Sequence, residues 1–260
     1  MLKILKYSFY DLSRSLWSYV YFFFYLLLGV VLLFLNNDLS NAVITLMNVI
    51  IILVPLIGTI FGVMYFYNSR EFTELLLAQP VRRSSIFLGQ YLGVAISLSA
   101  SLILGLGLPF IIYGLFQSGA IWDFASLLVS GVFLTFIFTA LAFNIALSHE
   151  NKIKGFGLAI LLWLFLAVVY DGLFLLSLVY FQDYPLDKFS LVASMLNPID
   201  LSRILILLKL DISALLGYTG AVFKQFFGTG LGAFTSIAVL SLWVILPVWR
   251  IKYISAKKDF

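Results

Sequence analysis

The sequence predicts an all-α polytopic membrane protein with six transmembrane helices in a single transmembrane domain, residues 1–260. Of the 260 residues, 63% are hydrophobic and only 11% are charged, whereas a soluble domain is about half apolar and about a quarter charged. The mean hydropathy is +1.09. The apolar residues also gather into six runs, each long enough to cross the ~30 Å hydrocarbon core as a helix. These runs cover about 17–35, 42–67, 86–116, 124–148, 155–181 and 231–249.

Two of these spans contain helix-breaking residues. Pro55 and Gly58 predict a kink in the second span. Glycines and a proline cluster between 105 and 114, near the end of the third, and predict that this helix breaks or bends there.

Residues 1–16 precede the first span and are amphipathic. Leu2, Leu5, Phe9 and Leu12 alternate with lysines and an arginine. This pattern predicts an interfacial helix lying on the cytoplasmic face of the membrane.

A short charged segment, residues 69–80, separates the second and third spans. It reads as a helix that ends at Pro80, because proline lacks an amide hydrogen and crowds the preceding turn. Phe72, Leu75 and Leu76 fall on one face at helical spacing, and Arg70, Thr73 and Glu74 lie off that face. The segment is either an ordinary loop or a helix that docks onto an ATPase.

Residues 182–230 form the long segment between the fifth and sixth spans. Asn197, Pro198 and Asp200 together are typical of a helix start, with a cap, a first-turn proline and a first-turn acid. Apolar residues recur on one face of the helix that follows, which predicts an amphipathic helix at the outer interface. That face contains Leu201, Ile204, Leu205 and Leu208.

Positive charge sets the orientation. Six spans place both termini on one side of the membrane, and twelve of the sixteen lysines and arginines fall in the segments on that side. The positive-inside rule therefore predicts a multi-pass protein of the inner (cytoplasmic) membrane with both termini in the cytoplasm.

The residues that several kinds of catalytic and metal-binding sites require are absent from the sequence. There is no cysteine and one histidine, His149, so thiol nucleophiles and thiolate metal sites are excluded. The sequence has no phosphate-binding loop and no metalloprotease or serine hydrolase motif. We therefore expect no catalysis by this chain, no metal site and no bound cofactor.

Asp171 is the one ionisable residue inside a predicted span. A mid-span acid costs a few kcal/mol to insert, so it normally faces protein or water and finds a partner. Two interpretations stay open: a place on a substrate or conformational pathway, or a hydrogen bond to a serine, threonine or tyrosine of a neighbouring span.

The pattern resembles the ABC-2 type permeases. In that family an acid, arginine and Gly-Thr precede Leu-Glu-Leu-Leu-Leu-x-x-Pro, which is followed by arginine and then by Ile-x-x-Gly-Lys. Ser69 stands here for the acid, Glu71-Phe72 for Gly-Thr, Thr73 for leucine and Gln90 for lysine. The positions that match are Arg70, Glu74, Leu75, Leu76, Leu77, Pro80, Val81, Arg83, Ile86 and Gly89. The resemblance implies an ABC-2, type V exporter-like fold in which residues 69–80, Phe72 included, are the coupling helix that docks onto the ATPase.

Within that superfamily the chain is most similar to the NosY family. The resemblance lies in Val169-Tyr170-Asp171 and in Leu196-Asn-Pro-Ile-Asp-Leu-Ser-Arg203. It implies a homodimer, a cytoplasmic NosF-like ATPase that binds ATP and Mg, and a periplasmic β-helical NosD-like partner. The implied role is copper-site maturation of nitrous oxide reductase in denitrification. Asn197, Asp200 and Arg203 would then face the periplasmic partner.

Three alternatives remain at this point. One is a generic ABC-2 exporter of a lipid, drug or peptide, and genomic neighbours would distinguish it from the first reading. Another is a membrane anchor with no transport cycle, which would not depend on an ATPase. The third, an intramembrane enzyme, rests on Asp171 alone.

Overall fold

The computed structural model describes residues 1–260 except 37–38, 182–185, 210–222, 224, 227–229 and 258–260. The described residues form helices and no strand. Six of the helical stretches are long and apolar enough to cross a membrane, which confirms the all-α polytopic prediction. They are α2 (Leu16–Leu35), α3 (Leu39–Asn68), α5 (Arg83–Ile112), α6 (Ile121–Ser148), the run of α7 (Lys152–Leu164), a π-helical turn (Phe165–Val169) and α8 (Tyr170–Tyr180), and α12 (Gly230–Lys257).

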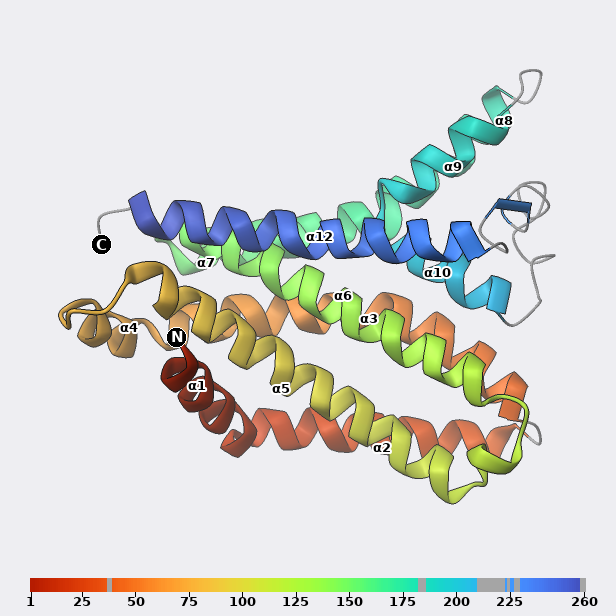
Figure 1. Ribbon diagram of the computed structural model, residues 1–260, viewed down its shortest axis with the longest axis horizontal. Helices are drawn as coiled ribbons and strands as arrows, with labels where there is room; N and C mark the ends of the chain where they lie inside the picture. The colour runs from red at the N-terminus through yellow and green to blue at the C-terminus, as the bar shows by residue number, and fades with distance from the viewer. Residues whose placement is uncertain (37–38, 182–185, 210–222, 224, 227–229, 258–260) are drawn as a thin grey trace.

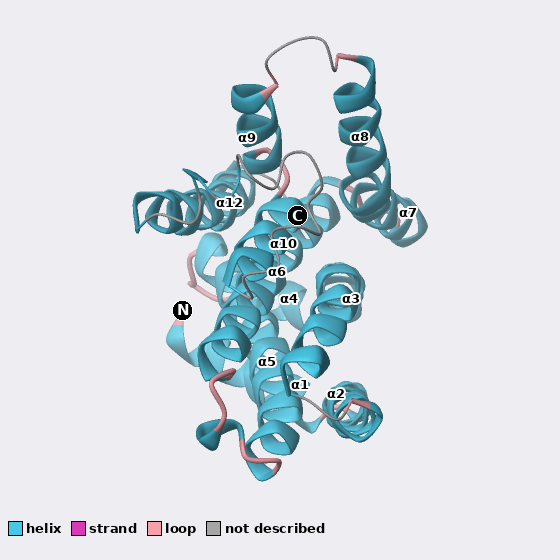
Figure 2. Cartoon of the chain, turned by 90° about the vertical axis from the view of Figure 1, so that its right-hand side faces the viewer, coloured by secondary structure: helices cyan, strands magenta, loops and turns pink. Residues whose placement is uncertain are grey.

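The long helices lie side by side, and the remaining elements gather at the two ends of the bundle (Figure 1). The N-terminal helix α1 (Leu2–Arg14) and the short helix α4 (Arg70–Leu77) lie at one end, together with the start of α7 and the end of α12. We call this the α4 end. The segments predicted to be cytoplasmic therefore share one end. At the opposite end, α8 and α9 (Asp187–Met195) project away from the bundle as a pair (Figure 2).

Helix α6 forms the centre of the bundle and packs against α3, α5, α12 and α10 (Pro198–Lys209). Its side chains Leu134 and Phe138 are fully buried. Apolar burial does not drive helices together in lipid, so small residues that allow close backbone approach are needed. At Gly62 of α3, an added Cβ would lie 2.8 Å from the Cβ of Ala142 in α6.

Helix α1 confirms the amphipathic prediction, but its packed face is different from the expected one. Ile4, Ser8 and Leu12 are buried, whereas Leu2 is 80% exposed. The buried face rests on α5, where a Cβ added at Gly93 would lie 2.6 Å from the Cβ of Ser8. The contact with α5 is made by this narrow row of small and branched side chains and not by the whole predicted apolar face of α1.

The Gly93→Val variant is expected to displace α1 from α5. The new side chain would overlap Ser8 and the α1 backbone beside it, so the helices must separate or α1 must detach. Overpacking of this kind costs about 1 to 3 kcal/mol. Limited proteolysis of the chain in lipid nanodiscs should show faster cleavage within residues 1–16. Gly157→Val is the control, because a Cβ at Gly157 meets nothing within 4 Å; equal cleavage in both variants would contradict the packing.

The third span breaks inside the predicted stretch 105–114, although only after Pro109. Helix α5 continues through Pro109 and ends at Ile112. The turn that follows depends on Gly114, whose φ of 95° lies in the left-handed region that glycine tolerates. Gly105 serves instead as a contact point, because a Cβ there would lie 2.9 Å from the Phe22 carbonyl oxygen of α2. The second span is one α-helix that contains Pro55, and the kink predicted there stays a prediction.

The predicted amphipathic helix at the outer interface is α10. The structure places it among the helices of the bundle, at the end opposite α4. The cap is confirmed, since the Ile199 amide donates to Asn197 Oδ1 at 3.1 Å. Ile199, Ile206 and Leu207 lie off the expected apolar face yet are buried, so α10 is enclosed on most sides and packs on α3, α6 and α12. α9 and α10 meet at a 114° bend. Within the segment 182–230, residues 182–185, 210–222, 224 and 227–229 lie outside the described residues.

Candidate functional site

Helix α4 crosses the α4 end of the bundle directly after α3 (Figure 1). The Thr73 amide donates to the Ser69 carbonyl at 2.9 Å and closes its first turn. The helix ends at Leu77, so it stops short of Pro80, which lies in the following turn. Residues that precede a proline disfavour the helical conformation. Arg83 then begins α5.

One side of α4 faces away from the chain. Arg70, Glu71, Glu74 and Leu75 are exposed, and Leu75 is 68% exposed. Arg70 Nε donates to Glu74 Oε1 at 3.0 Å, with both side chains about 60% exposed. A surface pair of this kind contributes only about 0.3–0.5 kcal/mol. The outward face therefore offers charged groups and one apolar side chain for contact with another molecule.

The inward face of α4 is not the apolar face that the sequence predicts. Thr73, which lies off the apolar face, is the buried residue of α4, and Leu75 points outward. Phe72 is half-buried because its ring stacks on that of Tyr7 in α1, with 4.4 Å between centroids. Leu76 and Leu77 are half-buried.

A buried hydrogen bond joins α4 to α5. Gln90 of α5 is fully buried, and its Nε2 donates to Thr73 Oγ1 at 2.8 Å. The Thr73 hydroxyl itself donates to the Ser69 carbonyl at 2.8 Å, so it is free to accept from Gln90. Positions 73 and 90 are two of those at which the sequence departs from the ABC-2 pattern, and here they contact each other. This role of Gln90 was not predicted from the sequence, although a glutamine near the start of an apolar span indicates a polar contact.

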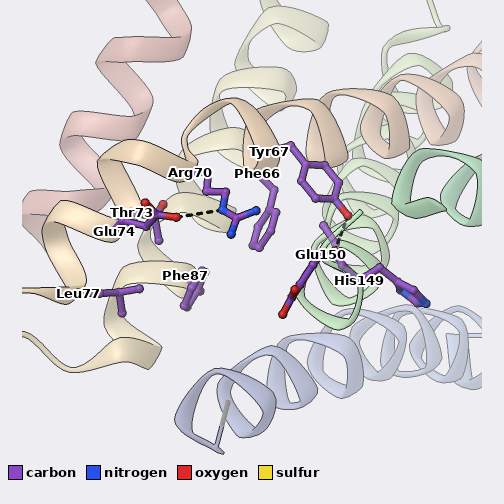
Figure 3. Close-up of a pocket in the computed structure, with 10 residues that line it drawn as sticks. Phe66, Tyr67, Arg70, Thr73, Glu74, Leu77, Phe87, His149 and Glu150 are labelled. Carbon is purple, nitrogen blue, oxygen red and sulfur yellow. Dashed lines mark hydrogen bonds and ion pairs between the residues drawn. The ribbon is translucent and has the colours of Figure 1, made fainter. Parts of the chain in front are cut away.

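A cavity of about 140 Å³ lies beside α4, between it and the loop that joins α6 to α7 (Figure 3). Arg70, Glu74 and Leu77 line it from α4, and His149 and Glu150 line it from the loop. The loop is held by Tyr67 of α3, whose hydroxyl donates to the His149 carbonyl at 2.6 Å. The α4 end thus presents a helix and a fixed loop around a shared hollow.

Most of the predicted docking residues meet at this end, although not all face outward. Arg70, Glu74 and Leu75 are exposed on α4, and Pro80 is exposed in the turn. Arg83 lines a neighbouring hollow with Glu74 and Leu77. Phe72 and Thr73 instead hold α4 to the rest of the chain.

A second polar cluster lies at the opposite end and contains Asp171. Arg203 Nη1 of α10 contacts Asp171 Oδ2 of α8 at 3.0 Å and Asp200 Oδ1 at 3.5 Å. Asn197 Nδ2 donates to Asp200 Oδ2 at 2.9 Å and to the Leu166 carbonyl at 2.8 Å. The partner of Asp171 is therefore an arginine and not the expected serine, threonine or tyrosine. We call these four residues (Asp171, Asn197, Asp200 and Arg203) the α8–α10 cluster.

The α8–α10 cluster lies beside the π-helical turn at 165–169. A π-helical turn shifts the backbone hydrogen-bond pattern, and such turns are frequent at functional sites. The Leu166 carbonyl in this turn accepts from Asn197, and the Tyr170 hydroxyl just beyond it donates to the Ala193 carbonyl of α9 at 2.6 Å. These contacts and the Arg203–Asp171 ion pair connect the start of α8 to α9 and α10.

The burial of the α8–α10 cluster corrects the expectation that three of its residues face a partner. Asn197 is fully buried, Asp200 is 5% exposed and the Arg203 side chain is 27% exposed. Their polar groups bond to one another and to the chain itself. Within the described residues, no group of three histidine, cysteine, aspartate or glutamate side chains could hold a metal ion.

Six helices long and apolar enough to cross a membrane, with a short exposed helix after the second, agree with the arrangement that the resemblance to ABC-2 type permeases implies. No family model matches the chain.

The chain is similar to two proteins described as probable ABC transporter permease protein NosY. One is from Stutzerimonas stutzeri, 28% identical over 187 residues, which cover 67% of this chain and 62% of that protein. The other is from Pseudomonas aeruginosa, 26% identical over 180 residues, with the same coverage of 67% and 62%. The match spans somewhat less than two-thirds of the relatives' length. These findings support a NosY-like ABC transporter permease.

Proposed function

We propose that the chain is the membrane subunit of an ABC transporter and that α4 docks onto a cytoplasmic ATPase. The observation that carries this proposal is the outward face of α4, which exposes Arg70, Glu74 and Leu75 at the end of the bundle. That end also collects the segments rich in lysine and arginine, which favours a cytoplasmic location. The sequence has no phosphate-binding loop, so the ATP must be bound in trans.

In this proposal the transmembrane helices transmit a conformational change. ATP-driven closure of the ATPase pushes α4, and the motion passes along the helices to α8, α9 and α10 at the periplasmic side. The two relatives are named NosY permeases. The process served is the one that the resemblance to the NosY family implies, copper-site assembly of nitrous oxide reductase, with a NosD-like periplasmic β-helix protein as the acceptor of the motion.

The proposed transporter is a homodimer. Helix α8 has no buried residue within one chain, although it is mostly apolar. Leu176 and Val179 are 67% and 69% exposed. A second copy of the chain would cover part of this surface, with lipid covering the rest.

One observation favours the alternative, an exporter of an apolar substrate. An apolar groove of about 650 Å³ opens between α5, α6 and α12. Its lining includes Val129, Phe133 and Val244, with Ser241 as its one polar residue. A lipid or an apolar drug would fit such a surface.

The test is co-expression of the chain with a NosF-like ATPase and a NosD-like β-helix protein. We expect the three to purify together and ATP turnover to require the membrane chain. We also expect nitrous oxide reductase from cells lacking the chain to contain less copper. Unchanged copper content, together with ATP turnover stimulated by lipid or an apolar drug, would favour the exporter. Absence of any ATPase from the purified complex would refute both.

A further inference from the structure

A side-chain hydrogen bond from Gln90 joins α4 to α5 in addition to the chain segment that connects the two helices. The two helices are connected in sequence by residues 78–82, which contain no helix. A hinge of that kind would bend when α4 is pushed. The bond from Gln90 Nε2 to Thr73 Oγ1 bypasses the hinge, and Gln90 Nε2 also lies 3.5 Å from Ser69 Oγ.

A polar hydrogen bond is not the most stabilising way to fill the space between α4 and α5. Gln90 Oε1 is buried and has no hydrogen-bond partner in the described part of the chain. A buried acceptor left unpaired carries a desolvation penalty that an apolar pair of similar size would avoid. What the bond adds is a fixed direction and register between two helices, which apolar contacts supply poorly.

Helix α1 supports the same junction from the other side. Tyr7 of α1 stacks on Phe72 of α4. A Cβ at Gly89, the residue before Gln90, would lie 3.0 Å from Ile4 of α1, so α1 presses closely on α5 here. Helix α4 is therefore held to α5 directly through Thr73 and indirectly through α1.

We propose that Gln90 is a positioning residue that makes α4 and the adjoining half of α5 move as one body. Displacement of α4 then turns α5 and does not bend the 78–82 hinge. The inference rests on the proposed docking of an ATPase to α4, and it names the residue through which that docking reaches the membrane helices.

The first test uses the membrane chain alone. The chain has no cysteine, so spin labels at Leu75→Cys in α4 and at Ile96→Cys in the adjoining half of α5, where Ile96 is exposed, report only this pair. We expect one narrow distance distribution in lipid nanodiscs and a distribution about twofold broader or more after Gln90→Leu or Thr73→Val. Thr73→Ser keeps the hydroxyl and should keep the narrow distribution. Ser99→Ala is the matched control, because it removes a buried α5 hydroxyl that has no hydrogen-bond partner among the described residues.

The second test uses the complex with its ATPase. Gln90→Leu should leave ATPase binding within about twofold of the unaltered complex, yet reduce permease-dependent ATP turnover about fivefold or more. The double variant Thr73→Val with Gln90→Leu should be no worse than either single change, because all three lose the same bond.

The outcomes separate the two proposals. If Gln90→Leu leaves the label distribution as narrow as in the unaltered chain, the proposed role of Gln90 is wrong whatever the ATPase does. If the label result is as expected but the unaltered chain binds no ATPase, the docking proposal fails and Gln90 remains a structural link between α4 and α5. A loss of turnover in Ser99→Ala equal to that in Gln90→Leu would also overturn the specific role.

Discussion

The Leu75→Asp variant is expected to fold and insert normally but to bind its partner ATPase at least about tenfold more weakly, which corresponds to about 1.4 kcal/mol. Leu75 is 68% exposed and has little packing to lose within the chain. In a docked complex, however, the new carboxylate would be buried against a surface that has to accept an apolar side chain, and an unpaired buried charge is costly. Binding can be measured by titrating ATPase onto the chain in nanodiscs.

The neighbouring leucine is a poorer probe. Leu76 is half-buried, so Leu76→Asp would disturb the seat of α4 as well as any docking. Phe116→Asp is the matched control, because Phe116 is equally exposed, at 68%, but lies in the turn Leu115–Gln117 that follows α5, at the other end of that helix from α4. Normal ATPase binding by Leu75→Asp, or an equal loss in Phe116→Asp, would argue against docking through α4.

The Arg203→Leu variant is expected to destabilise the bundle by about 2 to 3 kcal/mol, the range for hydrogen bonds to charged groups. Arg203 is the cation between Asp171 and Asp200, at 3.0 Å and 3.5 Å. Its removal leaves two carboxylates facing each other, one of them 5% exposed. Thermal unfolding in detergent, followed by tryptophan fluorescence, should show a midpoint lower by several degrees.

Asp171→Asn should cost less than about 1 kcal/mol. An asparagine oxygen can still accept from Arg203, and Arg203 keeps its contact with Asp200. Adding Asp171→Leu to Arg203→Leu should recover part of the lost stability, because it removes one of the stranded acids. If Asp171→Asn alone is as damaging as Arg203→Leu, then Asp171 has a role beyond this ion pair. Unchanged stability in both variants would show that the cluster does not hold α8 in place.

Local sequence determined the secondary structure of most of the molecule. An apolar helix in lipid satisfies its own backbone, so length and hydropathy alone predicted five of the six spans to within a few residues at most boundaries. The short helix 70–77 and the cap at Asn197 also followed from local residue types. The sixth span departed most, because α12 continues as one helix to Lys257, past the predicted end at 249.

The pairing of polar residues was decided only by the tertiary structure. Gln90 and Thr73 are 17 residues apart, and Arg203 and Asp171 are 32 apart. Nothing in either local sequence names the partner. In an apolar bundle each buried polar group is bound by whichever polar group the helix packing brings near, so the partner depends on rotation and crossing of whole helices. The same reason explains why Asn197 and Asp200, which the resemblance placed facing a partner, are buried, and why the buried residue of α4 is Thr73, which lies off the apolar face.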